Sequence, residues 1–120
     1  MIFVDTCILI DHSKDKIILS TDDKKDLCIN SIVQLEFLVG ALNKKELREF
    51  DKVLKNWNLA HIDQEVFNLS VELMKEYGLS HNMGVYDSII ASTCMIYHLP
   101  LWTHNKKDFR FLDIELYTRD

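Results

Sequence analysis

The sequence predicts an α/β fold, with a parallel five-stranded sheet flanked by helices. Short apolar runs rich in β-branched and aromatic residues alternate with longer segments whose apolar residues recur every three or four positions. Strands that alternate with helices favour a parallel sheet with right-handed crossovers. No repeat, low-complexity tract or shift in composition divides the 120 residues, which are enough for one hydrophobic core. We therefore expect a single domain over residues 1–120.

Each predicted strand is a short apolar run bounded by polar or turn-forming residues, and each predicted helix shows helical spacing or a capping signal. In chain order, the strands are Met1–Val4, Leu27–Ile29, Leu59–Ile62, Leu101–Thr103 after Pro100, and Ile114–Tyr117 at an edge. The helices are a short one beginning at Cys7–Ile10, one from Ser31 to about Leu42, the amphipathic Lys44–Trp57, one from Asp63 to Gly78, Asp87–His98, and a single turn at Phe109–Leu112.

Two of these helices carry clear end signals. Asn30 or Ser31 is expected to cap the helix after the second strand, with Gln34 completing a capping box after Ser31. Asp63 is the expected N-cap of the next long helix. Gly78 follows the last apolar residue of that helix, where a C-cap is expected.

The amino-acid composition limits which classes of protein are possible. Hydrophobic residues make up 48% and charged residues 28%, a balance typical of a globular domain without a long disordered tail. No apolar stretch approaches the roughly 20 residues of a membrane-spanning helix. No basic region precedes the first apolar run, so no signal peptide is expected. Cys7, Cys28 and Cys94 are odd in number and lie among apolar residues, which predicts reduced core cysteines in a cytoplasmic protein.

The formal net charge of −5 does not exclude a nucleic-acid partner. If four of the 19 acids neutralise a divalent metal, 15 remain against 14 Lys and Arg. Locally, Lys106, Lys107 and Arg110 surround Asp108, and such a basic segment would suit a phosphate backbone. The alternative is an ordinary solvated loop.

Four acidic residues at the edges of apolar segments are the most informative feature of the chain. Asp5 ends the first strand, Asp87 begins an apolar run, and Asp108 follows the fourth strand. Glu36 lies inside an apolar helix, with Ile32, Val33, Val39 and Gly40 at the spacings that share its face. Because functional groups gather at the carboxyl ends of parallel strands, these acids are expected to face one crevice.

Each acid also has a simpler explanation. Asp5 and Asp87 could be N-caps, and Asp108 could cap a turn or lie in solvent. Glu36 is harder to explain in this way, because a carboxylate among apolar neighbours is usually paired or bound to a cation. Carboxylate oxygens without clustered His or Cys suit Mg²⁺ or Mn²⁺ better than Zn²⁺. The pattern thus predicts a metal-dependent enzyme, since divalent ions held this way activate water and stabilise the leaving oxygen of a phosphodiester.

Four motifs together resemble those of the PIN-domain ribonucleases, and the small size is similar to that of the VapC-type toxins of toxin–antitoxin modules. These motifs, in order, are Val4-Asp5-Thr6, Ser31 through Glu36 to Gly40-Ala41, Tyr86-Asp87-Ser88-Ile89-Ile90-Ala91, and Thr103-His104-Asn105 leading to Asp108-Phe109. The resemblance covers essentially the whole chain. Cys7 is a departure, because this position is often polar in the family.

The resemblance implies a parallel five-stranded sheet and Mg²⁺- or Mn²⁺-dependent cleavage of RNA. It also implies a homodimer and inhibition by a cognate antitoxin whose C-terminal segment fills the active-site groove. Carried over by position, Asp5, Glu36 and Asp87 match the three steadier acids of the family, and Asp108 matches its more variable fourth. Thr6, Thr103 and Asn105 match polar residues that orient the acids or bound water.

Two rival hypotheses remain beside a metal-dependent endoribonuclease. One is a catalytically silent PIN-like domain that only binds RNA or a partner protein, but such a scaffold has no need for a carboxylate at position 36. The other is a receiver-type signalling domain, which would place paired acids after the first strand and a Lys after the last. Here Asp5 is a single acid, and no Lys follows Ile114–Tyr117.

Overall fold

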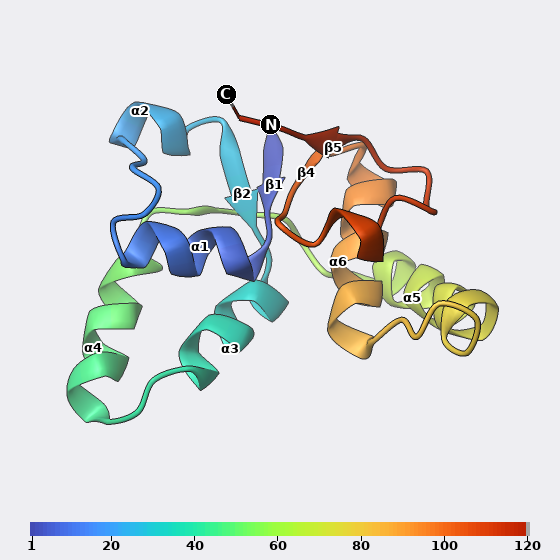
Figure 1. The fold of residues 1–120 in the computed structure, drawn as a ribbon, viewed down its shortest axis with the longest axis horizontal. Helices are drawn as coiled ribbons and strands as arrows, with labels where there is room; N and C mark the ends of the chain where they lie inside the picture. The colour runs from blue at the N-terminus through green and yellow to red at the C-terminus, as the bar shows by residue number, and fades with distance from the viewer. Residues whose placement is uncertain (120) are drawn as a thin grey trace.

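The fold is built around a five-stranded, all-parallel sheet with the strand order β3-β2-β1-β4-β5. A computed structural model describes residues 1–119 (Figure 1). The strands are β1 (Ile2–Val4), β2 (Leu27–Ile29), β3 (Asn58–Leu59), β4 (Leu101–Trp102) and β5 (Leu116–Tyr117). The helices are α1 (Thr6–Ser13), α2 (Thr21–Lys24), α3 (Ser31–Val39), α4 (Lys44–Val53), α5 (Gln64–Tyr77), α6 (Val85–Tyr97) and the 3₁₀ turn η1 (Lys106–Asp108). The predicted fold class is confirmed.

The strand order reverses between β1 and β4. The chain runs outward from β1 to β2 and β3, then returns across the sheet to place β4 on the other side of β1. In open parallel sheets, such a switch point opens a crevice at the carboxyl ends of the two strands involved. Register aligns Val4 with Trp102, so the residues after them, Asp5 and Thr103, emerge side by side at this crevice.

The helices divide into two groups because right-handed crossovers running in opposite directions fall on opposite faces of a sheet. Figure 1 shows α1, α3 and α4 gathered at one end of the molecule and the α5–α6 pair at the other. Helices α3 and α6 also contact each other, close to the carboxyl end of β1. No helix among residues 1–119 is both long and apolar enough to cross a bilayer.

The core lies between the sheet and these helices, and its central side chains are fully buried. The largest of them are Phe3, Phe37, Phe109, Ile8, Leu9, Ile29, Ile90 and Leu101. A buried polar link crosses this core from α3 to α6. Asn30 accepts a hydrogen bond from the Val33 backbone N–H as the N-cap of α3, and its Nδ2 donates to Thr93 Oγ1 on α6 at 3.1 Å. This link sets the position of α3 against α6.

The structure corrects several predicted details. The N-cap of α3 is Asn30 alone, so the capping box on Ser31 and Gln34 is wrong. Helix α2 is missing from the prediction, although Ser20 and Asp23 form a capping box there. Asp63 and Gly78 flank α5 as expected.

The end of the chain differs in a second detail. The single turn predicted at Phe109–Leu112 is present, with the Leu112 backbone N–H donating to the Phe109 carbonyl at 3.0 Å, but the 3₁₀ turn at Lys106–Asp108 that precedes it was not predicted. The five strands are also shorter than predicted or equal in length, and β3 begins one residue earlier.

Candidate active site

Asp5 is the central acid of the crevice. Its side chain is only 6% exposed, and both carboxylate oxygens accept hydrogen bonds. Oδ1 accepts from the Thr6 backbone N–H at 2.7 Å, and Oδ2 accepts from Thr103 Oγ1 at 2.8 Å. The expected capping role at α1 therefore coexists with a position in the site, since Asp5 is the N-cap residue of that helix. Thr103 ties the ends of β1 and β4 together through this carboxylate.

Glu36 reaches the same crevice from α3. Thr6 Oγ1 donates to Glu36 Oε1 at 2.9 Å, so the residue that follows Asp5 also orients the second acid. Burial raises the pKa of Glu36, the Thr6 hydrogen bond lowers it, and the charge of Asp5 raises it further. Glu36 is thus a half-buried acid without a cationic partner among residues 1–119.

Asp87 has the most perturbed carboxyl group of the site. Burial, the largest cause, and repulsion from Asp5, Asp108 and Glu36 together raise its pKa to about 6. This repulsion shows that all four predicted acids lie in one electrostatic environment. The alternative of a plain N-cap is wrong for Asp87, because Gly84 holds that position and Asp87 lies in the first turn of α6. Its negative charge is favoured there by the helix dipole alone.

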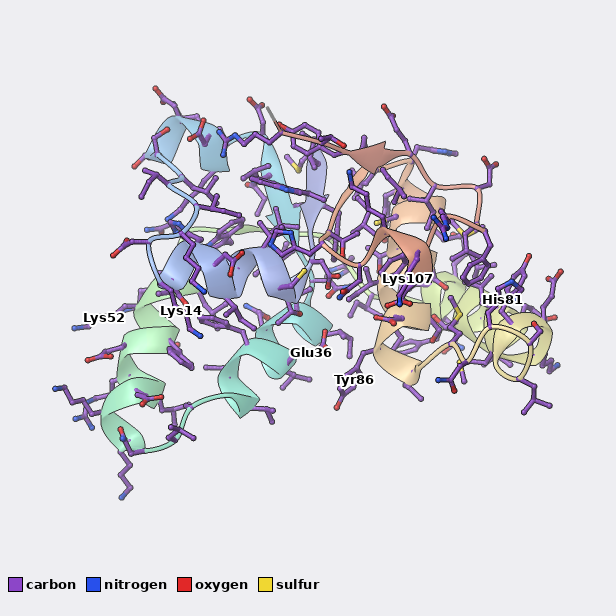
Figure 2. The ribbon with its side chains drawn as sticks, in the orientation of Figure 1. Lys14, Glu36, Lys52, His81, Tyr86 and Lys107 are labelled. Carbon is purple, nitrogen blue, oxygen red and sulfur yellow. The ribbon has the colours of Figure 1, made fainter. Side chains whose placement is uncertain are left out.

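Asp108 and its basic neighbours lie at the rim of the crevice. Asp108 ends η1 and is exposed, as are Asn105, Lys106, Lys107 and Arg110. The Asn105 backbone N–H donates to Thr103 Oγ1 at 3.0 Å, which holds the start of this loop against the site. Figure 2 shows Glu36 and Tyr86 on the facing helices α3 and α6, with Lys107 on η1 beside them.

Cys7 is a free, partly buried cysteine packed against the edge of the core, and its sulfur also reaches this site. Its Sγ lies 3.8 Å from Asp5 Oδ2 and 3.7 Å from Thr103 Oγ1, and it accepts a hydrogen bond from the His104 backbone N–H at 3.4 Å. Burial raises the pKa of the Cys7 thiol. Cys28 and Cys94 are buried as expected.

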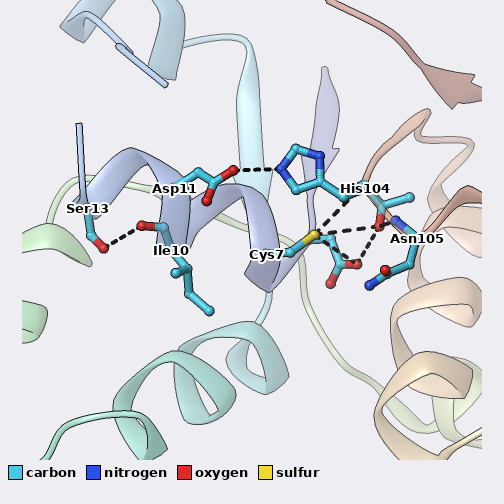
Figure 3. A network of polar contacts seen from close by, with 8 residues as sticks. Cys7, Ile10, Asp11, Ser13, His104 and Asn105 are labelled. Atoms are coloured by element: carbon cyan, nitrogen blue, oxygen red, sulfur yellow. Dashed lines mark hydrogen bonds and ion pairs between the residues drawn. The ribbon is translucent and has the colours of Figure 1, made fainter. Parts of the chain in front are cut away.

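His104 is held at two points by α1. Besides its backbone contact with Cys7, its Nε2 lies 2.7 Å from Asp11 Oδ2, one helical turn further along α1 (Figure 3). This pair attaches the β4–η1 loop, which carries Asn105 and Asp108, to the helix that begins at Asp5. The role of Asp11 was not predicted; its signal in the sequence is the four-residue spacing from Cys7, which places both residues on one helix face.

The donor set at this crevice fits a hard divalent cation. Carboxylate and hydroxyl oxygens are the ligands that Mg²⁺ and Mn²⁺ prefer, and four mutually repelling acids would be relieved by positive charge. Within residues 1–119, however, no three His, Cys, Asp or Glu side chains already converge on a common point as a metal-ligand set. Asp5 and Glu36 instead accept hydrogen bonds from Thr103 and Thr6. The predicted ligands therefore share a crevice without a preformed coordination sphere.

Thr103→Val tests the link between β1 and β4. The substitution keeps the shape of a residue that is 2% exposed but leaves the Asn105 N–H without this partner and Asp5 Oδ2 with only the 3.8 Å contact from Cys7 Sγ. We expect a loss of about 1–3 kcal/mol in the free energy of unfolding, measured by urea denaturation. Thr21→Val, at the exposed start of α2, is the matched control and should change stability by less than about 0.5 kcal/mol. Equal effects of the two variants would show that the Thr103 hydroxyl does not stabilise the junction of β1 and β4.

Comparison with known proteins places this architecture in a family. The PIN domain profile matches residues 2–115. The chain therefore belongs to the PIN domain family, and the resemblance in sequence is confirmed.

Similar individual proteins show which members of the PIN family this chain resembles. The chain is 30% identical over 114 residues to Ribonuclease VapC1 of Methanocaldococcus jannaschii. The matched region covers 92% of this chain and 80% of that protein. Among solved structures, a toxin–antitoxin complex from Klebsiella pneumoniae matches with a TM-score of 0.71 at 28% identity, over 94% of this chain and 93% of that one. VapBC2 from Rickettsia felis, bound to a DNA fragment from its promoter, has the same fold with a TM-score of 0.81 at 21% identity over the whole of both chains. This chain is thus similar to VapC-type PIN proteins over nearly its full length.

Proposed function

We propose that this chain is a metal-dependent endoribonuclease and the toxin component of a type II toxin–antitoxin module. The observation that carries the proposal is that Asp87 lies close enough to Asp5, Asp108 and Glu36, near the switch point of the sheet, for their charges to raise its pKa. Maintaining four close acids costs folding free energy, and a structural role would not require it. The similarity to Ribonuclease VapC1 supports RNA as the substrate.

The roles of the residues follow from their contacts. Asp5, Glu36 and Asp87 would hold Mg²⁺ or Mn²⁺, with Asp108 as a fourth, exposed acid. A bound ion of this kind supplies positive charge that activates an attacking water and stabilises the leaving oxygen of the phosphodiester. Thr103 and Thr6 orient the carboxylates of Asp5 and Glu36 through their hydroxyl groups.

The next residues extend the crevice toward the substrate. Asn105, held through its backbone by Thr103, would orient the substrate or a water molecule. Lys107 and Arg110, exposed around Asp108, would contact RNA phosphates without selecting bases. Lys106 starts the same turn and extends the basic rim.

A catalytically silent PIN-like domain is the alternative function. Binding of RNA or a partner alone would not require Glu36 and Asp87 to remain acidic where burial raises the pKa of both. Metal binding would explain why both residues are acidic, because a cation offsets the repulsion between the neighbouring carboxylates. This difference favours the nuclease.

Glu36→Gln tests the function directly. The purified chain should cut single-stranded RNA in Mg²⁺ or Mn²⁺ buffer, and the variant should lose activity by about 100-fold or more because one ligand of the ion becomes neutral. Product 5′ ends mapped by sequencing would show whether the cuts fall at defined positions. Glu65→Gln removes the same charge from an exposed position on α5 and should cut normally. Equal activity of the wild type and Glu36→Gln would favour the silent domain.

The partners in this proposal are a cognate antitoxin and a second copy of the chain, in the cytoplasm. The structure from Klebsiella pneumoniae supports the antitoxin, since it is a toxin–antitoxin complex by name. An apolar groove of about 490 Å³ between α5 and α6 supports the homodimer. Its lining includes Phe67, Val71, Met74, Val85 and Ile89. Phe67, Val71 and Val85 are exposed in the single chain, and an exposed apolar patch usually marks an interface.

A further inference from the structure

A second hollow lies on the other side of the β4–η1 loop from the acids. It has a volume of about 430 Å³ and lies between the segment that follows α1 and the end of the chain beyond β5. Its lining carries three permanent cations, Lys16, Lys106 and Arg119, together with the ring of His104 and the hydroxyl group of Thr118. Among residues 1–119, no carboxylate lines it. A concave, cationic surface is unusual in a chain with a net charge of −5.

The cations are held so that their charge faces the hollow. Lys106 Nζ donates to Thr118 Oγ1 at 2.7 Å, which fixes the ammonium group at the rim. The Arg119 guanidinium lies 5.3 Å from the ring centroid of Trp102, and Asp23 approaches it from α2 at 3.4 Å. Lys16 and Lys106 form no ion pair with a carboxylate among residues 1–119. Two full positive charges are therefore available to an anionic ligand.

The chemistry of the lining selects a phosphate group over a nucleobase. Trp102 forms the floor but is only 7% exposed and is covered by Arg119 and Tyr117, so its face is closed to base stacking. Ammonium, guanidinium and hydroxyl groups are donors that suit phosphate oxygens.

The hollow and the acidic site share the loop between β4 and η1. Trp102 lines the hollow, the next residue, Thr103, binds Asp5, and the His104 ring lines the hollow while its backbone N–H meets Cys7 on the acid side. A chain of phosphates that crosses this loop would thus reach both places.

We propose that this hollow, formed by Lys16, Lys106, Arg119, Thr118 and His104, binds a backbone phosphate of the RNA substrate away from the cleaved bond. The proposal rests on the proposed nuclease function and adds a subsite to it. The subsite offsets the repulsion between RNA and the acidic crevice before a metal ion neutralises it, because its cations attract the same strand a short distance away. It positions RNA without reading its sequence.

The test is the double substitution Lys16→Ala and Lys106→Ala, compared with Lys45→Ala and Lys52→Ala on the exposed side of α4. Both pairs remove the same charge from exposed positions. Binding of a short, non-cleavable 2′-O-methyl RNA is measured by fluorescence anisotropy in EDTA over a range of salt concentrations. We expect the first pair to weaken binding by roughly tenfold at low salt and to lower the salt slope by about 0.7 for each lost phosphate contact. The α4 pair should bind as the wild type does.

Inorganic phosphate is the second probe. In an NMR titration, the indole N–H signal of Trp102 should shift and saturate, whereas that of Trp57, the other tryptophan, should not. Lys16→Gln alone should weaken this response, and it leaves the Lys106–Thr118 contact in place if the double variant unfolds. Equal losses in both lysine pairs, or no loss in the first, would overturn the subsite. The nuclease proposal fails separately, when the wild type binds RNA through these lysines yet cuts none.

Discussion

Asp87→Asn is expected to abolish RNA cleavage and, at neutral pH, to make the protein more stable. Loss of one metal-binding carboxylate should lower the rate by about 10³-fold or more, since the bound ion supplies several kcal/mol of transition-state stabilisation. The carboxylate is ionised at pH 7 against Asp5, Asp108 and Glu36. The neutral amide removes this repulsion. Because water screens a half-buried group, the expected gain is only about 1 kcal/mol, or roughly 4 °C in Tm.

The gain in stability should depend on pH in a defined direction. The pKa of Asp87 is about 6 in the folded chain, against 3.8 for the ordinary group. The folded state therefore holds this proton more tightly, and the wild type loses stability as pH rises from about 4 to about 6. The Tm difference between Asp87→Asn and the wild type should be near zero at pH 4, grow across this window, and remain constant above it.

Asp63→Asn is the matched control for this prediction. Asp63 is a true N-cap, accepting a hydrogen bond from the Val66 N–H, and Asn serves equally well in that role. This variant should cleave RNA normally and melt within about 2 °C of the wild type. A lower Tm for Asp87→Asn than for the wild type at pH 7 would contradict the prediction. It would mean that the Asp87 carboxylate stabilises the start of α6 by more than its repulsion from the other acids destabilises the protein.

Removal of divalent metal is expected to have the second large effect. Chelation should reduce cleavage to background, and Mg²⁺ or Mn²⁺ should restore it, because the crowded oxygens of Asp5, Glu36 and Asp87 need a cation to act together. Added metal should also raise Tm, since a ligand that binds only the folded state stabilises it by mass action. Isothermal titration calorimetry measures the binding itself.

The same metal titration on Asp87→Asn separates a specific site from general ion effects. The rise in Tm with Mg²⁺ should shrink or vanish in this variant, whereas Asp63→Asn should respond as the wild type does. Cleavage that persists in EDTA, or a wild type that binds no Mg²⁺ or Mn²⁺ at millimolar concentration, would remove the metal from the mechanism.

The sequence by itself determined the fold class and the residues of the crevice. Alternating apolar runs and amphipathic segments specify a parallel α/β sheet, because strand and helix periods differ and each element must bury one face. Asp5, Glu36 and Asp87 were recognisable since acids beside core segments are costly and therefore informative. The position of Asp63 as a cap followed from local hydrogen bonding alone.

Features that depend on contacts between distant segments were decided only by the tertiary structure. Nothing near Cys7 in the sequence indicates that its sulfur meets a loop 97 residues away, and Asp11 is an ordinary helix residue until the fold brings His104 to it. Likewise, Lys16 and Arg119 join Lys106 around one hollow from opposite ends of the chain. The turn at Lys106–Asp108 has no side-chain cap, so its position depends on the packing of the buried Phe109 that follows it. Local sequence patterns specify helices and strands. Interactions between charged side chains, and cavities between segments, arise only where the strand order of the sheet brings distant segments together.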